Sequence, residues 1–151
     1  MKKFNFTLAK LMEIKEQELK QQKERLSELR KKQITLEEEK DELLRKSKNC
    51  NDDFNQKMAT VGLGVNEIQS TKVYLMRLRD DMLDLDNKIV QAIHNVEMQV
   101  QVVAAATMDL RVVEKLKEKK LEEYNKELLK DEEHFIEEYI NTAKHMSREN
   151  E

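Results

Sequence analysis

The sequence predicts an all-α protein built as a long antiparallel two-helix coiled-coil hairpin. The chain contains no proline, and both of its glycines, Gly62 and Gly64, lie in the apolar stretch ATVGLGV (59–65). Glycine lacks a Cβ atom and can adopt left-handed dihedral angles, so a helix ends there at the lowest cost. On both sides of this stretch, apolar residues recur with the spacing of a coiled coil. Together these features predict two helices joined by one reversal.

The composition favours a narrow core over a broad one. Charged residues make up 39% of the 151 residues and aromatic residues 5%, without any tryptophan. Such a chain cannot fill a globular core, but it can fill the seam between two helices. Apolar residues still reach 38% and recur periodically, which argues against disorder. The net charge of −3 gives no indication of a nucleic acid or an anionic membrane as partner.

We expect the first helix over residues 4–58. Its seam positions alternate at intervals of four and three residues, which places them on one stripe of the helix. The apolar members of this seam are Met12, Leu19, Leu26, Leu29, Leu36, Leu43, Cys50 and Phe54. The polar members are Gln22, Gln33, Lys40 and Ser47. Polar seam residues cost stability, but they fix the register and discourage other pairings.

After a loop over residues 59–66, we expect the second helix over 67–145 and a frayed tail over 146–151. Its seam continues at sevenfold spacing with Met82, Ile89, Val96, Val103 and Leu110. The companion positions are Leu78, Leu85, Ala92, Ala106 and Val113, with Gln99 as the polar exception. The whole chain, residues 1–151, is thus expected to form a single coiled-coil domain.

Antiparallel folding about the glycines pairs residues whose numbers sum to roughly 126, so the second helix extends about 25 residues beyond the first. Residues 115–130 carry six Lys/Arg against four Asp/Glu, and residues 131–151 carry two against seven. The paired open end is therefore mildly basic, and the residues beyond it are acidic. The structural alternative is a parallel homodimer of one uninterrupted helix, in which each helical glycine would cost about 1 kcal/mol relative to alanine.

The sequence contains no motif for catalysis, a cofactor or a metal ion. Cys50 is the only cysteine, which excludes an internal disulfide and a CxxC site. Metal sites in helix bundles need Glu-x-x-His pairs on facing helices, whereas the nearest approach here is the single Asp131-x-x-His134. A two-helix hairpin also offers no deep apolar pocket. We therefore expect a protein that is not an enzyme and binds no cofactor or metal.

Nucleic acid and membrane-spanning functions are not expected either. The lysine-rich run KLKEKK (115–120) is interleaved with glutamates, so it is not the one-signed basic face that nucleic-acid binding needs. No window holds the roughly 18 apolar residues that a membrane span requires. Lys10 interrupts the apolar run near the N-terminus, which argues against a signal peptide. The expected location is the cytoplasm.

Two groups of large side chains exceed what one seam can bury. Near the loop, Tyr74 precedes the seam residue Leu78, and tyrosine is a favoured interface anchor. The other interpretation of Tyr74 is that it closes the seam near the turn. Phe135 and Tyr139 belong to a second cluster, beyond the reach of the first helix. Since an unpaired helix with an apolar stripe needs a partner, this cluster predicts an interaction surface.

Three segments resemble the flagellar export proteins of the FliJ family. The opening MKKFNFTLAKLMEIKEQE (1–18) is similar to the start of that family, with basic residues, Phe-x-Phe-x-Leu and then Ile-Lys-Glu. The segment YLMRLRDDM (74–82) matches in position and character, and VVEKLKEKKLEEYNKE (112–127) is similar to the C-terminal block of the family. The resemblance covers nearly the whole chain.

The resemblance implies a coiled coil similar to the central stalk of rotary ATPases, which inserts into the hexameric ring of the flagellar type III export ATPase. It also implies contact with the export-gate membrane protein FlhA and cycling of export chaperones. The gate-contacting aromatic residue and leucine of the family match Tyr74 and Leu78, whereas its next two contact positions fall on Asp81 and Leu85, which do not fit. On the ATPase side we expect Lys115, Lys119, Lys120, Phe135 and Tyr139.

The resemblance further implies a cytoplasmic protein that is peripheral to the membrane through the gate. We expect a monomer in isolation. The alternative function is a structural coiled-coil scaffold or homodimer.

Overall fold

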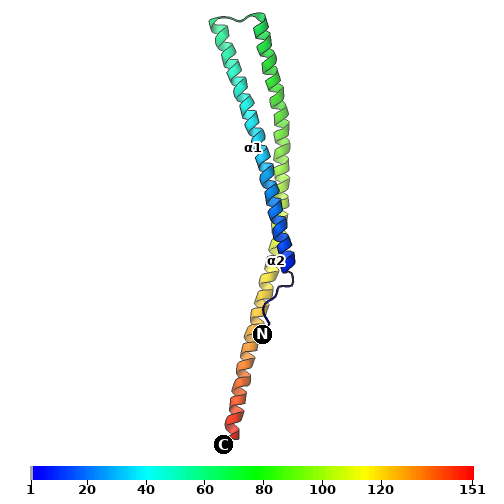
Figure 1. Ribbon diagram of the computed structural model, residues 1–151, viewed down its shortest axis with the longest axis vertical. Coiled ribbons are helices and arrows are strands. Elements are labelled where there is room, and N and C mark those ends of the chain that lie inside the picture. Colours follow the sequence, from blue (N-terminus) through cyan, green and yellow to red (C-terminus); the bar gives the residue numbers. More distant parts are fainter. Residues whose placement is uncertain (1) are drawn as a thin grey trace. The chain divides into compact units, whose positions relative to one another are not determined.

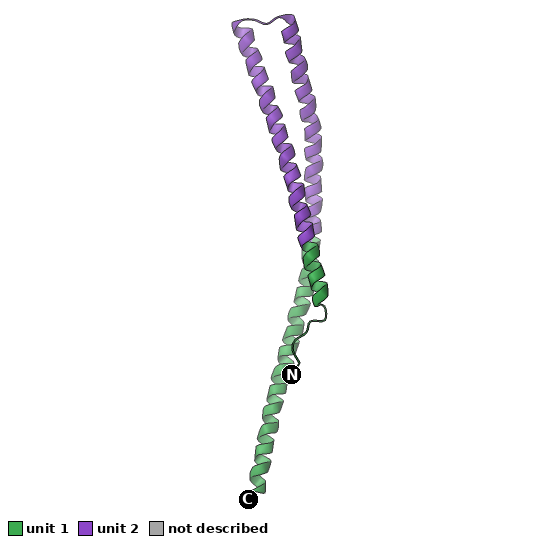
Figure 2. Ribbon diagram, in the orientation of Figure 1, with its two compact units in different colours: residues 1–19, 105–151 green, residues 20–104 purple. Residues whose placement is uncertain are grey.

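The computed structural model describes residues 2–151 and contains two helices, α1 (Ala9–Thr60) and α2 (Val65–Glu149), joined by a short loop (Figure 1). No strand occurs among the residues described. The two helices run antiparallel and pack against each other, so the predicted all-α helical hairpin is confirmed. The chain divides into two compact units (Figure 2): unit 1 comprises residues 2–19 and 105–151, and unit 2 comprises residues 20–104.

In unit 2, α1 buries the stripe that the sequence predicts. Between residues 20 and 60, the buried and half-buried side chains follow one another at alternating intervals of three and four residues. They are Gln22, Leu26, Leu29, Gln33, Leu36, Lys40, Leu43, Ser47, Cys50 and Phe54. Because an α-helix has about 3.6 residues per turn, this alternation keeps all of them on one face. The predicted seam of the first helix is confirmed over this range.

The facing stripe of α2 in unit 2 has its most deeply buried positions seven residues apart. These positions are Leu78, Leu85, Ala92 and Gln99. The companion residues Met82, Ile89, Val96 and Val103 are half-buried. A sevenfold repeat returns to the same side of a helix after two turns, so both sets face α1. The seam predicted for the second helix is thereby confirmed in this unit.

Two polar pairs cross the seam of unit 2 and define its register. The Nζ atom of Lys40 forms an ion pair with Asp86, and the side-chain amide of Gln99 donates hydrogen bonds to Gln22. In both pairs the residue numbers sum to roughly the 126 expected for a hairpin that turns at the glycines. Gln22 and Lys40, two of the polar seam residues of the first helix, therefore meet polar partners on α2.

The loop is shorter than the predicted range 59–66 because both helices extend into it. Gly62 has a φ of 74°, and its N–H donates to the Lys57 carbonyl at 2.9 Å. The same carbonyl also accepts from the Val61 N–H at 3.1 Å, and the bond from Gly62 needs the left-handed dihedral that glycine adopts freely. Gly64 has the N-cap position of α2, where its carbonyl accepts the first helical bond from Ile68 at 3.1 Å.

In unit 1, α1 begins at Ala9 and not at residue 4 as predicted. Residues 2–8, which we call the N-terminal strap, are not helical. Phe6 is buried and Phe4 is half-buried, whereas Asn5 and Thr7 between and after them are exposed. Such alternation with a period of two is characteristic of an extended chain with one face against a surface. The two phenylalanines therefore belong to an extended segment that contacts α2, which the prediction of a helix from residue 4 missed, and Leu8 after them is exposed.

The C-terminal part of α2 extends further than predicted. The helix continues to Glu149, whereas we expected fraying from residue 146. No glycine or proline occurs here to end it, and Arg148 lies in the last turn, where a positive charge is favourable to the helix dipole. Every residue from Leu129 to Glu151 is exposed. Within residues 2–151, neither helix has a stretch long and apolar enough to cross a membrane.

Candidate protein-interaction surfaces

The two residues predicted on the gate side have different environments in unit 2. The side chain of Tyr74 is 42% exposed, whereas Leu78, one turn later on α2, is only 5% exposed. Tyr74 can therefore offer its ring to another molecule. Leu78 belongs to the seam, so a substitution there would disturb the hairpin before it disturbed a contact.

A second apolar stripe runs along the outer side of α2 in unit 2, and sequence reasoning missed it. Met76, Leu83 and Val90 recur at intervals of seven residues and are 66%, 54% and 66% exposed. They are out of phase with the buried positions Leu78 and Leu85, so they point away from α1. The signal in the sequence was a second set of apolar residues at sevenfold spacing, which the search for a single seam passed over.

The three lysines predicted on the ATPase side lie in unit 1 and are exposed. Lys115 and Lys119 are four residues apart and so share one side of α2. Lys120 forms an ion pair with Glu123, with 3.2 Å between Nζ and Oε2. Of the three lysines, Lys120 is thus paired with a carboxylate of its own helix. The surface that the three lysines form is exposed, so an acidic partner could reach it.

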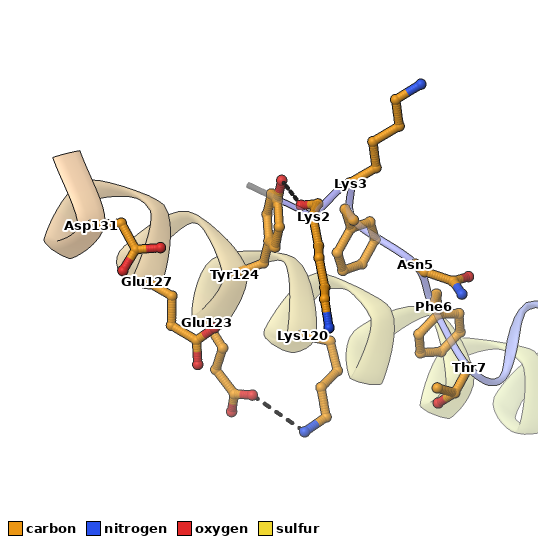
Figure 3. A pocket seen from close by; sticks show the side chains of 11 residues that line it. Lys2, Lys3, Asn5, Phe6, Thr7, Lys120, Glu123, Tyr124, Glu127 and Asp131 are labelled. Atoms are coloured by element: carbon orange, nitrogen blue, oxygen red, sulfur yellow. Dashed lines mark hydrogen bonds and ion pairs between the residues drawn. The ribbon is translucent and has the colours of Figure 1, made fainter. Parts of the chain in front are cut away.

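The N-terminal strap and α2 form a cleft in unit 1 (Figure 3). The Tyr124 hydroxyl donates to the Lys2 carbonyl at 2.8 Å, and the Phe4 ring lies 5.5 Å from the Tyr124 ring at an angle of 55°. The cleft encloses about 610 Å³ and is lined by lysines of both segments together with carboxylates of α2. Lys2, Lys3, Lys120, Glu123, Glu127 and Asp131 are these charged residues. Sequence reasoning did not anticipate this cleft, because it treated the strap as helix.

Phe135 and Tyr139, the remaining residues predicted on the ATPase side, lie on the part of α2 that no other described segment covers. We call residues 129–149 the overhang. Phe135 is 69% exposed and Tyr139 is 71% exposed. Exposed large apolar groups on an otherwise charged helix are typical of an interaction surface.

The profile of the family described as flagellar FliJ protein matches residues 4–149 of the chain. The chain belongs to the FliJ family. The family match spans the strap from Phe4 onward, both helices, the loop and the overhang, so the surfaces described above lie inside it except for Lys2 and Lys3 of the cleft. Membership makes the chain a flagellar export component. No curated protein and no solved structure matches the chain.

Groups that could carry chemistry are dispersed over the part of the chain that the structure describes. Among these residues, no three His, Cys, Asp or Glu side chains gather so that they could hold a metal ion. Cys50 is a half-buried free thiol of the seam. His134 pairs with Glu138 on its own helix at 3.4 Å.

Proposed function

We propose that the chain is a stalk that inserts into the hexameric ring of the flagellar export ATPase and links it to the export gate. The observation that supports this function most directly is the overhang, a helix of which every side chain is exposed and which carries Phe135 and Tyr139. A single helix of this kind gains little stability by itself, so its apolar side chains favour insertion into a partner. The exposed lysines Lys115 and Lys119 supply positive charge next to it for an acidic collar of the ring.

The test of this function is the assembly of the export ATPase with and without the chain. We expect one chain per ring to increase the specific ATPase activity at protein concentrations where the ATPase alone is dissociated, because binding to the hexamer stabilises it by mass action. Phe135→Ser together with Tyr139→Ser should abolish the increase. An ATPase whose activity and mass are the same with and without the chain would contradict the stalk function.

On the gate side, we propose that Tyr74 contacts the cytosolic domain of the export-gate protein FlhA, with Leu78 supporting it from the seam. Tyr74→Ala should leave the helix content and the melting temperature almost unchanged, because Tyr74 is 42% exposed and far less buried than the seam residue Leu78. It should weaken FlhA binding in a titration with the isolated cytosolic domain. Val73→Ala, at a neighbouring exposed position, is the matched control. Equal FlhA affinities of the wild-type chain and Tyr74→Ala would refute this assignment.

The proposed function includes cycling of export chaperones and a cytoplasmic location, peripheral to the membrane through the gate. A structural scaffold or homodimer is the second candidate, and the exposed stripe with Met76, Leu83 and Val90 favours it. Light scattering distinguishes the two functions. A mass of one chain at all concentrations supports the stalk, and a constant mass of two chains supports the scaffold.

A further inference from the structure

The overhang carries a narrow apolar stripe that continues from Leu128. Phe135, Tyr139 and Met146 follow Leu128 at intervals of seven, four and seven residues, which brings all four to one side of an α-helix. The last three are exposed to more than half of their surface. At its first turns the stripe forms a shallow hollow between Leu128, Phe135 and Ile136. A partner that fills it would therefore bury mainly apolar surface.

The charges next to this stripe are all negative. Asp131, Glu138 and Glu149 follow one edge of it, and Glu132 lies on the other edge. Asp131 and Glu132 also border the hollow. The basic residues of the same segment, Lys130, Lys144 and Arg148, fall on the opposite side of the helix. The overhang thus presents an apolar stripe between carboxylates to its surroundings.

The carboxylates beside the stripe favour one kind of binding partner over others. If the overhangs of two copies of the chain paired through this stripe, their flanking carboxylates would face each other. Like charges that flank a helix seam oppose pairing. Anionic lipid headgroups would be repelled in the same way. An amphipathic helix with Lys or Arg beside its own apolar stripe satisfies both features, because the apolar residues interdigitate and the flanking charges attract.

We propose that the overhang is the docking site for a basic amphipathic helix of another protein. The helix pairs with α2 through Phe135, Tyr139 and Met146, and its Lys or Arg residues meet the flanking carboxylates. The identity of the partner rests on the proposed function, under which a helix of the export ATPase would bind here. The chemistry of recognition does not depend on that assignment and is tested separately.

The test uses the full chain and two labelled helical peptides of equal length. Both peptides carry the same apolar heptad stripe, with Lys at the flanking positions in one and Glu in the other. We expect saturable binding of the Lys peptide in fluorescence anisotropy, with an affinity that falls as salt is added, and at least about tenfold weaker binding of the Glu peptide. Equal affinities for the two peptides, or no binding of the Lys peptide, would overturn the proposal.

Two variants of the chain locate the site. Phe135→Ser with Tyr139→Ser should weaken binding of the Lys peptide by about tenfold or more, because the apolar anchors are lost. Glu132→Lys with Glu138→Lys should reverse the preference in favour of the Glu peptide. Leu83→Ser, at an exposed apolar position of unit 2, is the matched control and should bind as the wild type does. Wild-type affinity in the double serine variant would show attraction to the acidic protein as a whole, and a loss in the control equal to that in the double serine variant would show that binding is not confined to the overhang; either result would overturn the site.

The same double serine variant separates the two proposals. If it loses the Lys peptide but still stimulates the export ATPase like the wild-type chain, recognition of a basic helix stands and the ATPase is not its source. If it retains the Lys peptide but no longer stimulates the ATPase, the docking site proposed here is wrong, whereas the stalk function stands. Far-UV circular dichroism of each variant confirms that α2 is intact.

Discussion

Gln99 donates two hydrogen bonds to Gln22 across the seam of unit 2, one from Nε2 to the backbone carbonyl at 3.0 Å and one to the side-chain Oε1 at 2.7 Å. The two residues are 77 positions apart in the chain, and Gln99 is only 7% exposed. A buried amide without a partner costs about 1–3 kcal/mol, so a shift of one helix against the other would be penalised here. The pair therefore selects one register for the hairpin, as polar seam residues do in coiled coils.

Removing the amide of Gln99 should destabilise the hairpin. Gln99→Ala loses both bonds and leaves space in the seam, so we expect the free energy of unfolding to fall by about 1–2 kcal/mol. Gln22→Leu with Gln99→Leu replaces both partners by apolar groups and should restore or raise the free energy of unfolding. The variant should also lose its preference for one register, so that other pairings of the helices become possible. Urea unfolding followed by circular dichroism measures the first effect, and light scattering measures new oligomers in the second. A double leucine variant that is less stable than Gln99→Ala would contradict this role.

The effect of a leucine-to-aspartate substitution on the stability of the hairpin should depend on which side of α2 carries the leucine. Leu85 is 9% exposed and lies in the seam, whereas Leu83, two residues earlier, is on the outer side. Leu85→Asp would bury a carboxylate without a partner, which should lower the free energy of unfolding by more than about 3 kcal/mol. Leu83→Asp, the matched control, should change it by less than about 0.5 kcal/mol. Similar melting temperatures of the two variants would show that the burial pattern of unit 2 is wrong.

The two glycines of the loop should differ in their tolerance to substitution. Gly62→Ala forces a residue with a Cβ atom into the left-handed region and should cost about 1–2 kcal/mol. Gly64 has open space around its Cα and no positive φ, and its carbonyl begins α2. Gly64→Ser should therefore be neutral or stabilise by a few tenths of a kcal/mol as an N-cap. Thermal unfolding of both variants tests the difference, and a more stable Gly62→Ala would refute the loop geometry.

The N-terminal strap should detach when its buried ring is removed. Phe6→Ala takes away the most buried side chain of residues 2–8, so the amides of this segment should exchange with deuterium faster while the helices stay folded. Tyr124→Phe removes only the hydrogen bond to Lys2 and should have a smaller effect in the same direction. Asn5→Ala, at an exposed position, is the control. Mass spectrometry of the N-terminal peptide measures the exchange, and equal rates in Phe6→Ala and Asn5→Ala would show that the strap is not anchored by Phe6.

The seam could be read from the sequence because its signal is periodic and local. Leu26, Leu29 and Leu36 follow the coiled-coil interval, and a one-position error would place charged neighbours in the seam. The turn was equally accessible, since two glycines in a chain without proline leave one place for a reversal. The exposure of individual side chains was accessible only in part. The exposure of Tyr74 and Phe135 agrees with the expectation, whereas the outer stripe around Leu83 became evident only when the seam was known.

The amino-acid sequence by itself determined that the chain forms two helices, where they turn and which residues lie between them, because helix propensity and hydrophobic periodicity act over a few neighbouring residues. Only the tertiary structure decided that residues 2–8 leave the helix and lie along α2, and that Gln22 meets Gln99. Both outcomes depend on groups brought together from distant positions, such as the Tyr124 hydroxyl and the Lys2 carbonyl. The residues next to these groups in the sequence do not indicate such contacts, since the contacts form only when the two helices pack together.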